Sequence, residues 1–187
     1  MFKEIIKNIA VALNRKKIPY MIIGGQAVLL YGEPRLTRDI DITLGIGTDE
    51  IEKIIEVINE TGLKILIKDI NKFVNETMVL PAIDEETKIR VDFIFSFTTY
   101  EKQAINNSKR VLLDDIEVYF ASPEDIIIHK IFSGRPRDIE DIKSILLKNE
   151  NIDVKYINKW LKEFQKTFPE KNFTKKFEKI IKTSLEK

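Results

Sequence analysis

Two adjacent glycines between an apolar run and an acidic strand constrain the fold of this chain more than any other feature. They lie in the stretch IIGGQAVLLYGEPRLTRDIDITL, residues 22–44. The apolar run before Gly24 predicts a buried strand, which Gly24 and Gly25 end, and a helix is expected from the next residue to Tyr31. Residues 39–44 then alternate polar and apolar side chains with the period of a strand. The simplest interpretation is a turn followed by an exposed strand, and the alternative is a phosphate cradle facing a metal site.

The first 121 residues alternate helical and strand-like patterns. Helices are expected at 2–16, 26–31, 48–59 and 102–107, and strands at 20–23, 39–44, 63–67, 77–83, 88–96, 111–113 and 116–120. The segment DEET between two of these strands predicts a hairpin turn.

The character of the chain changes at Ser122. The sequence Ser-Pro-Glu-Asp is a strong helix start, and helices are expected at 123–132, 136–148, 153–167 and 173–185. The predicted fold class is α+β, with a mixed central β-sheet flanked by helices and followed by a helical part. We expect a catalytic-type domain over residues 1–121 and a helical C-terminal part, residues 122–187, packed on it.

Composition excludes some classes and leaves others open. The chain has no cysteine and no long apolar run, which excludes disulfides, thiolate metal sites and a membrane-spanning helix, and we expect a cytoplasmic protein. The net charge is +1, but residues 155–187 hold ten lysines and four glutamates. This basic end indicates an anionic partner such as RNA or, as the commoner case, a solvated helix face. The aromatic residues between Trp160 and Phe177 indicate helix packing more than base stacking.

Three aspartates carry the predicted chemistry. Asp39 and Asp41 lie two apart on one strand and therefore point to the same face. Asp92 lies in the apolar strand KIRVDFIFS, where a lone carboxylate is unfavourable unless it is paired or binds a metal. Carboxylate oxygens suit Mg²⁺ or Mn²⁺, and three acids can hold two such ions about 3.5–4 Å apart.

The glycine pair complements the three acids. Glycine lets backbone N–H groups approach a ligand, and the N-terminus of the following helix favours an anion. Strand, glycine pair, helix and Asp-x-Asp strand together predict a site for a nucleoside triphosphate with metal ions. The sequence lacks both the P-loop motif and the dinucleotide-binding G-x-G-x-x-G motif.

Gly24-Gly25, Asp39-Ile40-Asp41 and Asp92 together resemble the signature of the DNA polymerase beta type nucleotidyltransferase superfamily. The segments RLTRDIDITL and KIFSGRPRDIEDI further resemble its abortive-infection (AbiE toxin-like) and minimal nucleotidyltransferase groups. The resemblance covers roughly residues 18–145 and implies a nucleotidyltransferase fold.

The resemblance also implies a role for each matching residue. Gly24 and Gly25 would cradle the β- and γ-phosphates, Asp39 and Asp41 would bind both metals, and Asp92 would complete one metal site and position or deprotonate the attacking hydroxyl. The reaction would transfer a nucleotidyl group from a nucleoside triphosphate and release pyrophosphate, with the protein supplying position and charge.

Further nucleotide-binding candidates flank these residues. Arg38 can meet phosphate or, equally, form a surface pair with Glu33. Lys130 and Asp138 match the resemblance, in which the lysine would reach the triphosphate and the aspartate would orient the lysine. The alternative is an acid that compensates the dipole at a helix start, in an ordinary exposed pair. The nucleotide-binding candidates are Gly24, Gly25, Gln26, Thr37, Arg38, Lys130 and Asp138.

Two classes of function are predicted. The first is a magnesium-dependent transferase that acts on a hydroxyl of RNA or tRNA, of a protein or of a small molecule, in one setting as part of a toxin–antitoxin pair with a cognate partner. The second is a regulatory or partner-binding module that binds nucleotide without transfer. The presence of all three acids favours the first.

Overall fold

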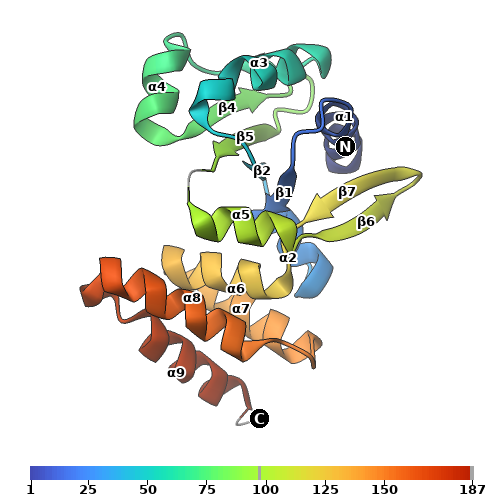
Figure 1. Ribbon diagram of the computed structural model, residues 1–187. Helices are drawn as coiled ribbons and strands as arrows, with labels where there is room; N and C mark the ends of the chain where they lie inside the picture. Colours follow the sequence, from blue (N-terminus) through green and yellow to red (C-terminus); the bar gives the residue numbers. More distant parts are fainter. Residues whose placement is uncertain (97, 186–187) are drawn as a thin grey trace. The chain divides into compact units, whose positions relative to one another are not determined.

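The computed structural model describes residues 1–96 and 98–185 (Figure 1). The chain forms two compact units, one made of residues 1–26 and 36–121 and the other of residues 27–35 and 122–187. Helix α2 (Gly24–Tyr31) begins in the first unit and continues into the second. The expected division into domains after residue 121 stays a prediction.

The first unit is an α+β layer structure built on one sheet. Its helices are α1 (Phe2–Arg15), the short η1 (Thr48–Glu50), α3 (Ile51–Glu60), α4 (Ile70–Thr77) and α5 (Thr99–Asn106). Its strands are β1 (Tyr20–Ile23), β2 (Asp39–Leu44), β3 (Lys64–Ile65), β4 (Val79–Ile83), β5 (Arg90–Phe95), β6 (Lys109–Leu113) and β7 (Ile116–Phe120).

The seven strands form one mixed sheet in the order β3-β4-β5-β2-β1-β7-β6. Strands β2 and β5 are parallel neighbours at its centre, β1 pairs antiparallel with β2, and β7 pairs parallel with β1. The predicted fold class, with its mixed central sheet, is confirmed.

Alternation along the two central strands separates an apolar face from a polar face. On β5, Val91, Phe93 and Phe95 are completely buried, whereas Arg90 and Asp92 face the other way and keep contact with solvent. Each fully buried side chain of this kind stabilises the fold by about 1.5–3 kcal/mol. This burial fixes the register, because a slip by one residue would turn the apolar set outward.

The second unit is a helical bundle. It contains α6 (Pro123–Ser133), α7 (Pro136–Lys148), α8 (Val154–Thr167), the short η2 (Pro169–Lys171) and α9 (Phe173–Leu185). Helix α6 begins as predicted: Ser122 accepts a hydrogen bond from the Asp125 backbone N–H, and Pro123 occupies the first turn.

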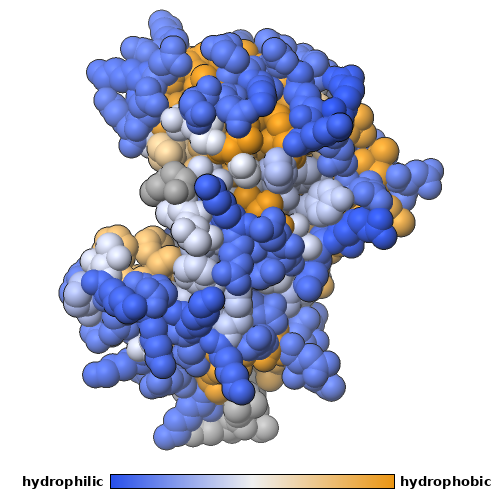
Figure 2. Space-filling model, in the orientation of Figure 1, coloured by the Kyte–Doolittle hydropathy of each residue, from blue (hydrophilic) through white to orange (hydrophobic). Residues whose placement is uncertain are grey.

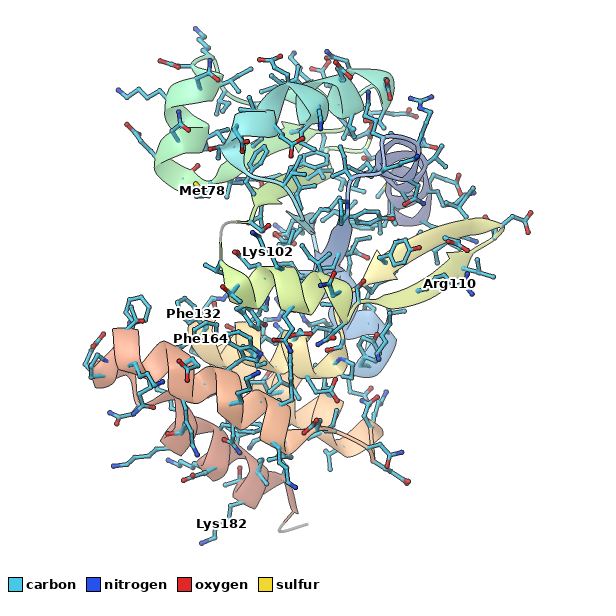
Figure 3. All side chains as sticks on the ribbon, in the orientation of Figure 1. Met78, Lys102, Arg110, Phe132, Phe164 and Lys182 are labelled. Atoms are coloured by element: carbon cyan, nitrogen blue, oxygen red, sulfur yellow. The ribbon has the colours of Figure 1, made fainter. Side chains whose placement is uncertain are left out.

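Aromatic side chains form a packing seam in this bundle. Phe132 meets Phe164 edge to face, with ring centroids 5.4 Å apart (Figure 3). Phe132 also stacks on Phe173 at the same centroid distance. Phe173 and Phe177 are buried, so the packing interpretation is confirmed for them. Phe132 is 46% exposed, so one end of this seam reaches the surface, where Figure 2 shows apolar areas among a mainly hydrophilic covering.

Most predicted elements are confirmed within a few residues, including all four C-terminal helices and the hairpin between β4 and β5. Two expectations are wrong. Residues 70–77 form helix α4, capped by the Asp69 side chain, whereas Thr77 was expected to begin a strand. Gly24 and Gly25 belong to helix α2 itself and do not form a turn before it. Within the described ranges, none of the helices combines the length and apolar character needed to cross a bilayer.

Candidate active site

The polar face of the central strands brings the three predicted aspartates together. In the parallel β2–β5 pair, Asp41 lies directly opposite Asp92, and Asp39 lies opposite Arg90. Paired strands are about 4.8 Å apart, so neighbouring side chains on one face are within reach of a common ligand. The sequence spacing predicted the Asp39–Asp41 face, and the register adds Asp92 to it.

The glycine pair lies beside the same aspartates. Ile23 at the end of β1 is paired with Asp41, so the chain enters α2 immediately next to the Asp41 carboxylate. Gly24 adopts φ +64, and a Cβ added there would lie 2.0 Å from Asp41 Oδ2. Any L-side chain would collide with the carboxylate and strain the backbone. Glycine is therefore required at this position by both conformation and space.

Helix α2 presents anion-binding groups at this point. Gly24, Gly25 and Gln26 form its first turn, where backbone N–H groups have no acceptor within the helix. Gln26 is only 7% exposed, and its Nε2 has no hydrogen-bond partner in the structure. A buried amide without a partner is unfavourable unless a ligand or water satisfies it. Gln26 thus supports the prediction of a polar ligand here.

Asp92 and Asp39 each accept a hydrogen bond from a neighbouring side chain. Asp92, 18% exposed, accepts a hydrogen bond and ion pair from Arg90 Nε at 2.8 Å. Asp39 Oδ1 accepts a hydrogen bond from the Thr37 hydroxyl at 3.0 Å. The pairing of Thr37 with Asp39 places that residue at the edge of the site, while Arg38 beside it is exposed. Glu33, the alternative partner considered for Arg38, forms an ion pair with Lys148.

The donor set fits a divalent cation by chemistry and by backbone position. Across residues 1–96 and 98–185, no three acidic or histidine side chains stand in a metal-binding arrangement. Asp92 turns to Arg90, and Asp39 turns to Thr37. Their oxygens are nevertheless the ligands that Mg²⁺ and Mn²⁺ prefer, and only a glycine leaves space beside Asp41. Asp39, Asp41 and Asp92 are therefore able to hold such an ion once Asp92 leaves Arg90.

Lys130 and Asp138 form a separate buried network in the second unit. Lys130 Nζ lies 3.0 Å from Asp138 and 2.6 Å from Asp141, and all three side chains are nearly inaccessible to solvent. Arg35 pairs with Asp141 and Arg135 with Asp138. Burial would raise the pKa of Asp138, but hydrogen bonds from Arg135 and Lys130 outweigh it and hold that pKa below its usual range.

This network accounts for the burial of Lys130, because each buried charge has an opposite partner. Asp138 also accepts a hydrogen bond from the Arg135 backbone N–H and so caps α7. Asp138 lies in the first turn of α7, as the alternative interpretation has it, but its pair with Lys130 is buried and not exposed. A part for Lys130 and Asp138 in nucleotide binding stays a prediction.

Sequence reasoning missed Arg90 as a member of the site. Arg90 lies two residues before Asp92 in a strand, and that spacing alone places both side chains on one face. Thr43 was also missed: it follows Asp41 by two residues, is 1% exposed, and its hydroxyl has no hydrogen-bond partner among the residues that the structure describes.

Comparison with known proteins gives one family match. The chain matches, over residues 1–185, the model of a family described as "Nucleotidyltransferase of unknown function (DUF6036)". No curated protein matches the sequence.

Several solved structures share the fold. The solution structure of the antibiotic-resistance factor ANT(2'')-Ia has a TM-score of 0.60 and 17% identity, with 89% of this chain and 92% of that chain covered. The crystal structure of ANT(2'')-Ia with adenylyl-2''-tobramycin gives 0.58 and 17%, covering 89% and 98%. An antigenic nucleotidyltransferase-like protein from Paracoccidioides brasiliensis gives 0.55 and 18%, covering 89% and 88%.

Proposed function

Because the chain belongs to this nucleotidyltransferase family, we propose that it transfers a nucleoside monophosphate from a nucleoside triphosphate to a hydroxyl group, in a magnesium-dependent reaction. The observation that carries the proposal is the approach of Gly24 to the Asp41 carboxylate, with Asp92 opposite Asp41 on the neighbouring strand. The start of helix α2 and the three carboxylates thus lie together on the central strands, which supports a site for a triphosphate and a metal ion.

Each residue has a role in this proposal. The N–H groups of Gly24 and Gly25 and the Gln26 amide bind the triphosphate tail, with Thr37 and Arg38 at its edge. Asp39, Asp41 and Asp92 hold Mg²⁺ or Mn²⁺, which when bound neutralises phosphate charge and lowers the pKa of the attacking hydroxyl. In the second unit, Lys130 and Asp138 stay candidates for support of the nucleotide.

The proposed reaction is an in-line displacement. The acceptor oxygen forms a bond to the α-phosphorus while the bond from that phosphorus to the bridging oxygen breaks, and pyrophosphate leaves. Once Arg90 releases the Asp92 carboxylate, Asp92 would take the proton from the attacking hydroxyl. The protein contributes mainly position and charge.

The acceptor is the open part of the proposal. The crystal structure of ANT(2'')-Ia is a complex with adenylyl-2''-tobramycin, which supports a small hydroxylated acceptor as one class. The basic residues 155–187 support RNA or tRNA as another, and a protein hydroxyl is the third. A toxin–antitoxin setting with a cognate partner, and a cytoplasmic location, are proposed on the sequence resemblance and the lack of cysteine.

The test is incubation of the purified protein with each of four α-labelled nucleoside triphosphates, Mg²⁺, and separate pools of RNA, protein and small molecules. Label is expected in one pool, and it should fall by at least ~10²-fold in Asp41→Asn and Asp92→Asn. Asp115→Asn, at an exposed turn of the same unit, is the matched control and should keep full activity. Nucleotide binding without label in any pool would replace the transferase by the regulatory module, and no binding at all would refute both.

A further inference from the structure

A pocket in the helical bundle combines an apolar floor with a rim of lysines. It has a volume of about 330 Å³ and lies between α6, α7 and α9, within the second unit. Ile131, Ile142 and Ile180 form its floor and are buried, and Ile139 stands at its mouth, 41% exposed. This volume is at the lower end of the range of small-molecule sites. The lining contains no aromatic side chain, which favours an aliphatic ligand over a stacked ring.

The charge around this pocket is of one sign. Lys143, Lys176 and Lys179 line it, and none of the three pairs with an acid in the described part of the chain. Lys130 lines it too, but its ammonium is neutralised by two buried carboxylates. Three like charges around one small cavity repel one another, and an anion between them removes that repulsion.

Two ordinary explanations of these lysines account for only part of the arrangement. Gly134 caps the C-terminal end of α6, and a Cβ added there would lie 3.9 Å from Lys176 Nζ. Lys176 is therefore near a helix C-terminus, where a cation is favourable. Solvated lysines are also common on an amphipathic helix such as α9. Neither explains why unpaired lysines from α7 and α9 converge on one apolar pocket, while Lys182 of the same helix projects away from the bundle (Figure 3).

We propose that this pocket binds an amphiphilic anion, a medium-length aliphatic chain that ends in a single carboxylate or phosphate. The chain lies on the four isoleucines, and the head group lies among Lys143, Lys176 and Lys179. This site is independent of the nucleotidyl-transfer site of the first unit, and its test does not require activity.

The test is NMR of the full chain with ¹³C-labelled isoleucine methyl groups, titrated with octanoate. Octanol supplies the same chain without charge, inorganic phosphate supplies charge without a chain, and octyl phosphate distinguishes the two head groups. Octanoate or octyl phosphate should shift the methyl signals of the pocket isoleucines, and octanol should bind at least ~10-fold more weakly, because it lacks the charge-assisted contact. Inorganic phosphate should leave these signals in place.

Two pairs of substitutions isolate the charge at the pocket. Lys176→Gln with Lys179→Gln should weaken octanoate binding about 10-fold. Lys175→Gln with Lys182→Gln makes the same change of charge on the same helix outside the pocket lining and should change the affinity less than about twofold. Equal weakening by both pairs would show a general basic surface, such as one for nucleic acid, and would overturn the proposal.

One further variant tests the cavity itself. The Ile139 side chain is 41% exposed, so Ile139→Trp places a larger side chain in the pocket mouth. This variant should show no octanoate shifts, and the methyl signals of isoleucines outside the pocket should stay where they are in the unchanged protein. If this variant does not fold, the two lysine pairs still decide. Octanoate at about 10 mM detects Kd values in the millimolar range, so the absence of any isoleucine shift at that concentration would refute the site. Octanol binding as tight as octanoate binding would refute it too.

Discussion

Replacing Gly24 by alanine tests the central contact of the proposed site. The new Cβ would lie 2.0 Å from Oδ2 and 3.0 Å from Cγ of Asp41, in a residue with φ +64. Two penalties then act together, the strain of a left-handed backbone and the overlap with the carboxylate. The structure allows them to be separated, because Gly62 has φ +71 and its added Cβ would meet nothing within 4 Å.

The expected magnitudes follow from this pair. Gly62→Ala bears only the backbone strain, about 1–2 kcal/mol of unfolding free energy. Gly24→Ala bears the same strain plus an overpacking penalty of about 1–3 kcal/mol. The gain from a stiffer unfolded chain is common to both substitutions and cancels in their comparison. In an Asp41→Ala background only the Asp41 Cβ remains, at an ordinary 3.4 Å, so Gly24→Ala should then cost no more than Gly62→Ala.

Urea unfolding measures this difference as a double-mutant cycle. Far-UV circular dichroism should be followed together with Trp160 fluorescence, because Trp160 reports on the second unit and the substitutions lie in the first. A coupling of about 1–3 kcal/mol between Gly24→Ala and Asp41→Ala is expected. If Gly24→Ala matches Gly62→Ala within about 0.5 kcal/mol in both backgrounds, the glycine does not abut the carboxylate and the cradle is refuted.

Three other predictions concern charge. Arg90→Met should strengthen Mn²⁺ binding, measured by electron paramagnetic resonance, because it frees the carboxylate that Arg90 now pairs with; unchanged or weaker binding would contradict that competition. The pKa of Asp138 is lowered in the fold, so its stabilising contribution is present above the unfolded value near ~3.9 and is lost as pH falls through the folded value. Asp138→Asn should therefore be less stable at neutral pH, and its unfolding free energy should fall less steeply below about pH 4. If the unfolding free energies of the variant and the unchanged protein fall in parallel as the pH is lowered, the lowered pKa of Asp138 is contradicted. Hydrogen bonds from Lys3 and Lys7 lower the pKa of Asp114 to about 2, which NMR titration should detect, and replacing both lysines by methionine should return it towards 3.8.

The strands that carry the three aspartates were predictable, because successive side chains of a strand point to opposite faces of the sheet. The alternation in residues 39–44 identifies a strand with Asp39 and Asp41 on one face, and β2 has those bounds in the structure. The apolar alternation around Asp92 fixes its face in the same way, since Val91 and Phe93 must be buried. The Ser-Pro-Glu-Asp start of α6 was also readable, because capping chemistry is local.

Tertiary contacts decided what the sequence did not reveal. Helix α4 has only eight residues, which is too short to form alone, and packing against β4 and the Asp69 cap stabilise it in the fold. Lys130 is buried against Asp141 of the next helix, and Asp141 also pairs with Arg35, which is far away in the sequence and meets it only in the folded unit. Charge partners of this kind have no periodic signal, so a sequence pattern cannot assign them.

In the proposed transferase, the pairing of Asp92 with Arg90 makes cation binding an exchange of partners. Three carboxylates on adjacent strands repel one another, and the fold relieves part of this repulsion with Arg90 and with the Thr37 hydroxyl. A divalent ion must therefore compete with an ion pair whose arginine side chain is half exposed and hence weakly held. The surface position of Arg90 keeps this competition mild, whereas a buried arginine would hold Asp92 too firmly to release. The same carboxylates can thus be satisfied with and without a metal ion, which allows the strands to fold before nucleotide and metal arrive.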